Sequence, residues 1–137
     1  GGEGAIQYVT IEEANVYFQG RLHSEKWDEA TEENKQKAIT TATKRIDMQR
    51  IAKTWDAAED APQAVKDACC EEALALLTTD MSRLARIAAG IDSVRIGDAS
   101  ESYSETAIRR ASSGEELLSP IAKQLLSRYI VRAVPIR

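Results

Sequence analysis

Apolar residues recur at intervals of three and four through the first half of the chain, the spacing of one face of an α-helix. Thr10 to Glu13 fits a capping box, and the stripe Ile11, Ala14, Phe18 and Leu22 follows it. We therefore predict a helix over residues 11–22. Residues 23–31 are polar except for Trp27 and Ala30 and are predicted to be a connector.

A second helix is predicted over residues 32–50, because Thr31 and the acidic residues after it signal a helix start. Its apolar positions form one stripe and its cations fall on the other side. The inner face is expected to hold Ala38, Ile39, Ala42 and Ile46, and the outer face Lys35, Lys37, Lys44 and Arg45.

The longest helix is predicted from Pro62 to Ala89, a stretch without an evident helix breaker. Steps of four and three give it a heptad-like seam that should face other helices. The seam consists of Cys70, Leu74, Leu77, Met81, Leu84 and Ala88. Gly90 is expected to end the helix as a left-handed C-cap.

The pattern changes after Gly90. Residues 91–114 combine a few apolar residues with Gly and small polar residues, which favours an extended loop or loose hairpin over residues 91–113. Ser119 and Pro120 then signal a last helix over about residues 120–130, with Ile121, Leu125 and Tyr129 on its inner face. Pro135 favours an extended tail over residues 131–137.

Together these elements predict a mainly α fold: a bundle of about four helices with one long extended loop or hairpin and an extended C-terminal tail. The 137 residues suit one domain, which we place at residues 8–130. Residues 1–7 are expected to be a flexible start or a remnant of cloning. No apolar run approaches the roughly 20 residues of a membrane span, and no signal peptide is evident, so we expect a soluble, unsecreted protein.

Charge is distributed unevenly along the chain. Residues 1–82 carry 9 basic and 16 acidic side chains, whereas residues 83–137 carry 9 basic and 6 acidic ones. Such a split suits subunits that stack on an oppositely charged neighbour. The alternative is a chance distribution over a solvated surface.

The sequence contains no convergent set of catalytic groups. His23 is the single histidine, and P-loop, GxGxxG, GxSxG and paired-cysteine zinc motifs are absent. We expect the carboxylate pairs Glu71-Glu72 and Glu115-Glu116 to lie on solvated surface. The adjacent Cys69 and Cys70 are expected to fill the core, a redox or metal role being the alternative. We therefore predict no enzyme and no catalytic, cofactor or metal site.

Nucleic-acid binding is weighed separately, because Arg109, Arg110 and the basic C-terminus could contact phosphates. The pI is about 5.1 and only 5% of residues are aromatic. A platform of stacked aromatic rings interleaved with cations is therefore hard to assemble.

One pattern extends over several stretches of the chain: Tyr8 to Phe18, Trp27, Ala38 to Asp47, Val94 to Asp98, Tyr103, Leu118 to Ala122 and Leu125-Leu126. These stretches resemble the head-tail connector (adaptor) family of tailed bacteriophages. The resemblance spans about residues 8–130 and includes no catalytic signature. Some members of that family carry the label "DnaT-like single-stranded DNA-binding protein".

The resemblance implies a structural virion protein, a helical head-to-tail adaptor that forms a dodecameric ring. Such a ring sits in the neck between the portal protein and a tail-side connector or stopper protein, after assembly in the host cytoplasm. It lines a channel through which DNA passes without sequence-specific binding, and it needs no cofactor and no membrane. The alternative is a single-stranded DNA-binding or replication accessory protein.

Adaptors of this family hold the portal and neighbouring subunits with an extended loop and the C-terminal segment. The resemblance therefore implies a protein interface in residues 91–113 and 131–137. The expected interface residues are Val94, Arg95, Ile96, Gly97, Tyr103, Arg109, Arg110, Arg132, Val134, Pro135, Ile136 and Arg137.

Overall fold

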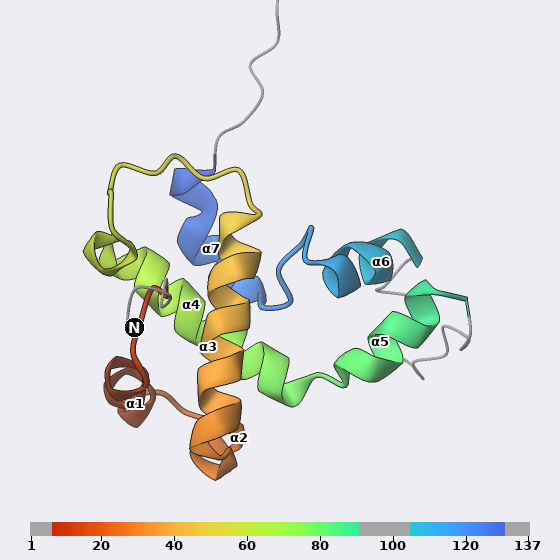
Figure 1. Ribbon diagram of the computed structural model, residues 1–137, viewed down its shortest axis with the longest axis horizontal. Coiled ribbons are helices and arrows are strands. Elements are labelled where there is room, and N and C mark those ends of the chain that lie inside the picture. Colours follow the sequence, from red (N-terminus) through yellow and green to blue (C-terminus); the bar gives the residue numbers. More distant parts are fainter. Residues whose placement is uncertain (1–6, 91–104, 131–137) are drawn as a thin grey trace, which may run out of the picture.

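The computed structural model describes residues 7–90 and 105–130, and this part of the chain is mostly helical (Figure 1). Its elements are α1 (Ile11–Gln19), α2 (Glu25–Glu29), α3 (Glu32–Asp47), η2 (Ala58–Asp60), α4 (Gln63–Thr78), α5 (Met81–Ala88), α6 (Glu105–Ser113), α7 (Pro120–Leu126) and η4 (Ser127–Tyr129). Within these ranges the only extended pairing is an isolated antiparallel bridge between Ile51 and Ile130. The mainly α prediction is confirmed.

The N-terminal helix begins where the sequence indicates and ends earlier. Thr10 and Glu13 form the predicted capping box, but α1 stops at Gln19 with Gly20 as its C-cap. Leu22, placed on the inner stripe by its spacing, is 80% exposed. The apolar spacing continues past Gly20, where the helix ends, so the spacing alone predicted too long a helix.

The predicted connector 23–31 contains a short helix, α2, that anchors Trp27 in the core. The indole is fully buried, lies 4.9 Å from the Phe18 ring and donates its N–H to Asn15 Oδ1 at 2.8 Å. Lys35 Nζ lies 5.3 Å from the indole centroid, a cation–π contact. A buried aromatic side chain with a satisfied N–H fixes this turn of the chain against α1.

Helix α3 confirms its predicted inner face. Thr31 caps it by accepting the Asn34 N–H, and Ala38, Ile39, Ala42 and Ile46 are all buried. The helix ends at Asp47, three residues before the predicted boundary.

Helix α4 is the centre of the molecule. It packs mainly against α3 and α7 and also contacts α1 and α2 (Figure 1). A helix covered on several sides has little surface left for solvent. Val65 and all seven residues from Ala68 to Leu74 are buried. With α1, α3 and α7, this helix forms a body that approximates the expected bundle of about four helices.

The single helix predicted from Pro62 to Ala89 is wrong, because the chain breaks between α4 and α5. Thr79 has extended backbone angles, and the Asp80 carboxylate accepts the Arg83 N–H as the N-cap of α5. An aspartate cap stops one helix and starts the next without any glycine or proline. Gly90 has a φ of +81° after α5, so its left-handed conformation is confirmed.

Helices α5 and α6 pack on each other and project from the body as an arm, at the right in Figure 1. Ile87 and Ile108 are buried but lie outside the main core cluster. Helix α6 falls inside the predicted extended loop 91–113, so that prediction is wrong for residues 105–113. Residues 91–104 lie outside the described part of the chain.

The last helix has its predicted start but a different inner face. Ser119 accepts the Ala122 N–H, and Pro120 occupies the first turn. Ala122 and Leu126 are buried, whereas Ile121 is 45% exposed, so the predicted stripe is displaced by one position. Leu125 and Tyr129 are partly buried against the core.

No helix in the described ranges is both long and apolar enough to cross a membrane.

Candidate interaction surfaces

The two adjacent glutamates of α4 are buried, and the prediction that they lie on solvated surface is wrong. Arg21 approaches Glu71 with two nitrogens, Nε at 2.7 Å and Nη2 at 3.0 Å, and the Tyr17 hydroxyl donates to the same carboxylate. Burial and this hydrogen bond raise the pKa of Tyr17, and the hydrogen bond to Glu71 raises the pKa of Arg21. Glu71 therefore ties α1 and the turn after it to α4.

Glu72 joins α4 to the segment that leads into α7. Its carboxylate accepts the backbone N–H groups of Leu118 and Ser119 at 2.9 to 3.0 Å and pairs with Arg45 Nε at 2.8 Å. Arg45 Nη2 also donates to the carbonyls of Ala111 and Glu116. Arg45 was expected on the outer face of its helix, and burial in this network corrects that expectation.

These carboxylates are engaged in holding helices together. Among the described residues, every buried side-chain nitrogen and oxygen has a hydrogen-bond partner. The sequence did contain a signal for this burial: the residues around Glu71 and Glu72 are Ala, Cys and Leu on all sides of the helix. A helix that is apolar all round is enclosed, and a glutamate within it needs a partner.

Cys69 and Cys70 are free thiols in the core, as predicted. Burial raises the pKa of Cys69 to about 12 and that of Cys70 still further. Both thiols therefore stay protonated near neutral pH and pack as small apolar groups. In the described ranges no three His, Cys, Asp or Glu side chains come together as metal ligands.

Of the predicted interface residues, two lie in the described part of the chain. Arg109 and Arg110 are exposed on α6, in the second half of the helix. The others, Val94, Arg95, Ile96, Gly97, Tyr103, Arg132, Val134, Pro135, Ile136 and Arg137, lie outside the described residues. His23 is exposed and has a φ of +62° in the turn after α1.

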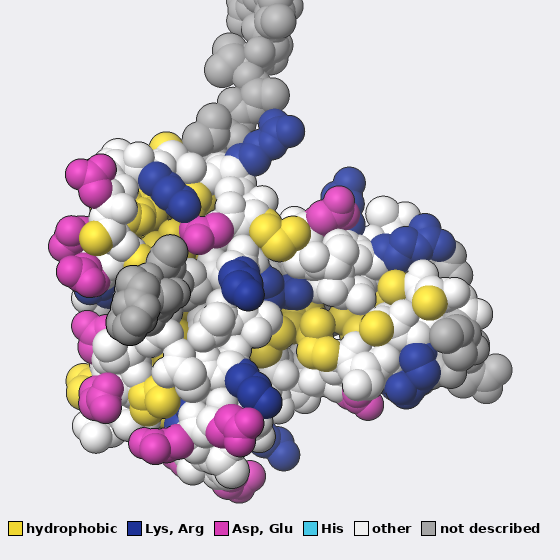
Figure 2. All heavy atoms as spheres, in the orientation of Figure 1, with side chains coloured by type: hydrophobic (Ala, Val, Ile, Leu, Met, Phe, Trp, Pro, Cys, Tyr) yellow, Lys and Arg dark blue, Asp and Glu magenta, His cyan; other side chains and the backbone are white. Residues whose placement is uncertain are grey.

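A groove with a volume of about 350 Å³ lies between α3 and the junction of α4 with α5. Figure 2 shows apolar side chains gathered where the body meets the arm. The groove is lined by Asn34, Lys37, Ala38, Thr41, Leu76, Leu77 and Met81. We call it the α3–α5 groove.

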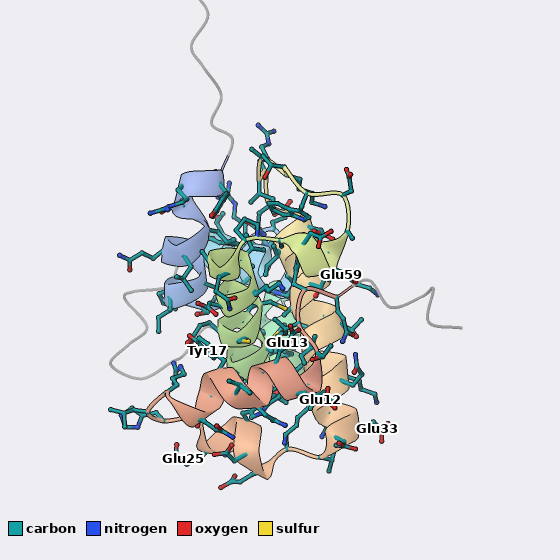
Figure 3. The ribbon with its side chains drawn as sticks, turned by 90° about the vertical axis from the view of Figure 1, so that its left-hand side faces the viewer. Glu12, Glu13, Tyr17, Glu25, Glu33 and Glu59 are labelled. Carbon is teal, nitrogen blue, oxygen red and sulfur yellow. The ribbon has the colours of Figure 1, made fainter. Side chains whose placement is uncertain are left out.

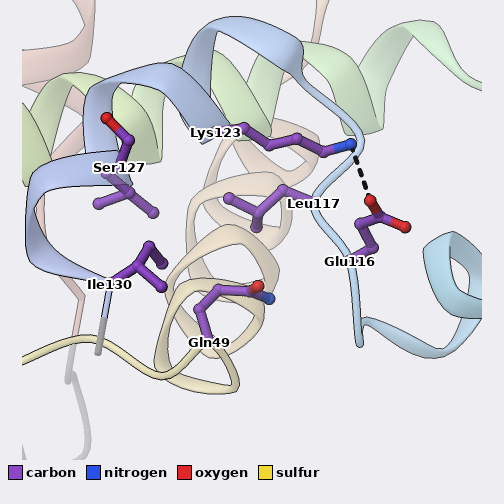
Figure 4. A pocket seen from close by; sticks show the side chains of 7 residues that line it. Gln49, Glu116, Leu117, Lys123, Ser127 and Ile130 are labelled. Atoms are coloured by element: carbon purple, nitrogen blue, oxygen red, sulfur yellow. Dashed lines mark hydrogen bonds and ion pairs between the residues drawn. The ribbon is translucent and has the colours of Figure 1, made fainter. Parts of the chain in front are cut away.

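A second pocket, with a volume of about 220 Å³, lies between the end of α3 and α7, where the described chain ends at Ile130. Its apolar residues are Leu117, Leu126 and Ile130. Lys123 and Glu116 form an ion pair at one side of it, with Nζ and Oε2 3.2 Å apart (Figure 4).

Acidic side chains gather on the face opposite the arm. Glu12 and Glu13 of α1, Glu25 of α2, Glu33 of α3 and Glu59 of η2 lie on the side that Figure 3 turns toward the viewer. A shallow pocket between α1 and α4, with a volume of about 240 Å³, lies here and is lined in part by Val16, Glu13 and Lys66.

The arm has the opposite charge. Helices α5 and α6 contain four arginines, Arg83, Arg86, Arg109 and Arg110, and one glutamate, Glu105. In Figure 2 acidic side chains are most frequent at the end of the body away from the arm, whereas basic side chains lie at the outer end of the arm and also on the body. The charge split along the sequence is therefore in part a split in space.

We compared the chain with protein-family models, curated proteins and solved structures, and none of the three comparisons finds a match.

Proposed function

We propose that this chain is a structural virion protein: the head-to-tail adaptor of a tailed bacteriophage, assembled as a dodecameric ring. The ring sits in the neck between the portal protein and a tail-side connector or stopper protein. It lines the channel through which DNA passes without sequence-specific contacts, and it acts without a cofactor and without catalysis.

The observation that carries the proposal is the α5–α6 arm. It is a pair of helices with its own small buried cluster, it stands away from the body, and it presents Arg109 and Arg110 to solvent. A projecting element with its own packing can reach a neighbouring protein while the body keeps its fold. Its position in the sequence overlaps the segment to which the family resemblance assigns portal contacts.

The body supports the same proposal. Its buried charges, Glu71 with Arg21 and Glu72 with Arg45, are paired inside the fold. The surface separates an acidic face from a basic arm, and a closed ring needs two different surfaces on each subunit. Complementary potentials favour the correct docking orientation and speed encounter.

The portal partner is proposed to contact the arm and the C-terminal segment. Arg132 and Arg137 would meet acidic portal groups, while Val134, Pro135 and Ile136 would supply apolar contacts. The segment begins directly after Ile130, which lines the pocket of Figure 4. Arg95 and Tyr103, with Val94, Ile96 and Gly97, belong to the same proposed interface.

Capture of the purified chain by the portal protein of the same phage tests this proposal. We expect wild type to bind, and we expect Arg109→Glu with Arg110→Glu, or deletion of residues 131–137, to weaken binding by about tenfold or more, which corresponds to about 1.4 kcal/mol. The matched control is Lys44→Glu with Arg50→Glu, which reverses two exposed charges on the body and should bind like wild type.

A gel-shift titration with single-stranded DNA distinguishes the alternative function. An adaptor should bind the oligonucleotide weakly at physiological salt. Tight binding that falls steeply with salt concentration, together with no capture by portal, would instead identify a DNA-binding protein and refute the adaptor.

A further inference from the structure

Two apolar surfaces of the described chain are left uncovered on opposite sides of α3. One is the α3–α5 groove, with Leu76, Leu77 and Met81 in its lining. The other consists of Glu12 and Val16 on α1 together with Leu22 in the turn after the helix, and we call it the outer face of α1; Val16 is 68% exposed and Leu22 80% exposed. Figure 1 shows α1 on one side of α3 and the arm on the other, and the groove lies where α4 joins the arm through α5.

The two surfaces differ in charge in a way that makes them complementary. Lys37 is exposed and lines the groove, and α5 beside it carries Arg83 and Arg86 against the single carboxylate of its N-cap, Asp80. On α1 the exposed Val16 lines a pocket together with Glu13, and Glu12 and Glu13 lie on the acidic side of the molecule (Figure 3). Two grooves placed face to face would bring cations together, and two α1 faces would bring carboxylates together.

We infer that the α3–α5 groove of one copy receives the outer face of α1 from the next copy of this chain. Val16 and Leu22 pack on Leu76, Leu77 and Met81, and Glu12 approaches Lys37. Each subunit then offers two different surfaces, so the contact is heterologous and repeats around a ring. The inference rests on the proposed function for the ring and adds the surfaces that build it.

The present partner of Lys37 does not oppose this exchange. Lys37 Nζ lies 3.2 Å from Glu33 Oε2 in an i,i+4 pair on α3, and both side chains are largely exposed. Such a pair contributes little to stability in water, so Lys37 can exchange it for a carboxylate of a neighbouring copy. Lys66, which lies near Val16 in the pocket between α1 and α4, is accompanied there by Glu13 and Asp67, so this side stays acidic.

Two double variants test the contact. The face variant, Val16→Glu with Leu22→Glu, removes the apolar part of the α1 face and leaves the groove intact. The groove variant, Thr41→Glu with Met81→Glu, makes the groove acidic and leaves α1 intact. None of the four side chains is buried, so both proteins should keep the helix content and thermal midpoint of wild type.

The expected results follow from the two-surface geometry. In sedimentation velocity, wild type should self-associate with rising concentration, whereas each variant alone should stay monomeric. A one-to-one mixture should form dimers and stop there, because the groove of the face variant can still receive α1 of the groove variant. The matched control is Met48→Glu with Ile121→Glu, which alters two exposed apolar side chains outside both surfaces and should associate like wild type.

The inference is overturned if wild type stays monomeric up to about 1 mM, if either variant assembles as wild type does, if the mixture forms no dimer, or if the control loses association. Portal capture separates this failure from failure of the adaptor function. A monomeric wild type that still binds portal refutes only the ring contact. Assembly that follows the mixing result without any portal binding refutes only the adaptor.

Discussion

Arg45 and Glu72 form an ion pair that is closed off from water on both sides, with Nε and Oε2 2.8 Å apart and side chains 6% and 0% exposed. The pair also binds four backbone groups of residues 111–119: two carbonyls accept from Arg45, and two N–H groups donate to Glu72. It therefore fixes the chain between α6 and α7 to the body. A buried pair adds little net stability, but removing one partner leaves the other charged and unpaired.

Glu72→Ala should lower the free energy of unfolding by about 3 to 5 kcal/mol, because Arg45 and two backbone N–H groups lose their buried acceptor. Urea unfolding followed by circular dichroism measures this loss. The control is Glu116→Ala, which removes the half-exposed pair with Lys123 and should cost less than about 1 kcal/mol. Equal losses in the two variants would show that the Arg45–Glu72 pair is not closed to solvent.

Gly114→Ala should destabilise the protein by about 1 to 2 kcal/mol or more, because Gly114 has a φ of +91° in the left-handed region. The added Cβ would also lie 3.0 Å from Met48 Sδ. Denaturant unfolding measures the change. In Gly20→Ala the Cβ meets no atom closer than 4.0 Å, and φ is −99°, so that control should change stability little.

A double variant separates the two causes at Gly114. Met48→Ala removes the close contact but leaves the backbone strain, so it should recover only part of the loss in the Gly114→Ala background. Full recovery would mean that the backbone conformation carries no cost.

Local sequence signals predicted the helix starts well and the enclosure of α4 poorly. The side chains of Thr10, Thr31 and Ser119 each accept the backbone N–H of the residue three positions later in the sequence. The signal for each helix start therefore lies within a few adjacent residues. The burial of Glu71 and Glu72 depends instead on how many helices surround α4. Their partners are Arg21 and Arg45, some 50 and 27 positions away, and no local spacing connects them.

The arm shows the same limit. Residues 105–113 are rich in small and polar residues and form α6 because Ile108 becomes buried as the helix packs on α5, which is a tertiary cause. The break at Thr79 was hidden because the apolar steps stay in phase on both sides of it. Of the predicted interface residues, Arg109 and Arg110 lie in the described ranges; both are exposed, but they are on a helix where a loop was predicted.

Alkaline pH should destabilise the fold through its buried thiols. The pKa of Cys69 is raised by burial from 9.0 to about 12, so the folded thiol stays protonated where the unfolded thiol ionises. Its contribution to stability is complete below pH 9 and is lost as pH rises toward 12, on the order of 1 kcal/mol per pH unit. Burial also raises the pKa values of Cys70, Tyr8 and Tyr17, which act in the same direction.

Urea midpoints measured from about pH 8 to about pH 11 test this dependence. Cys69→Ala should lower the midpoint at every pH, because it leaves a small cavity, but should make the alkaline decline shallower. A variant whose midpoint falls with pH as steeply as that of wild type would exclude Cys69 as a source of the effect.

Ile108→Ala should unfold the arm before the body. Ile108 is 3% exposed and Ile87 is also buried, yet neither belongs to the main core cluster, so the cavity left by truncation falls between α5 and α6. Losing a buried isoleucine costs about 2 to 5 kcal/mol, which exceeds what a two-helix unit of this size can contribute alone. Hydrogen exchange should then show faster exchange of amides in α5 and α6, with α3 and α4 unchanged.

The control for the arm is Ile121→Ala, which shortens an exposed side chain on α7 and should leave hydrogen exchange unchanged throughout.

The hydrogen bond from Arg45 to the Ala111 carbonyl ties the end of α6 to the body, so amides near residue 111 should remain the most protected of the arm in the Ile108→Ala variant. If protection instead falls equally in α3, α4, α5 and α6, the arm unfolds only with the body. The arm would then be part of a single cooperative unit, and its capacity to adjust to a partner independently of the body would be refuted.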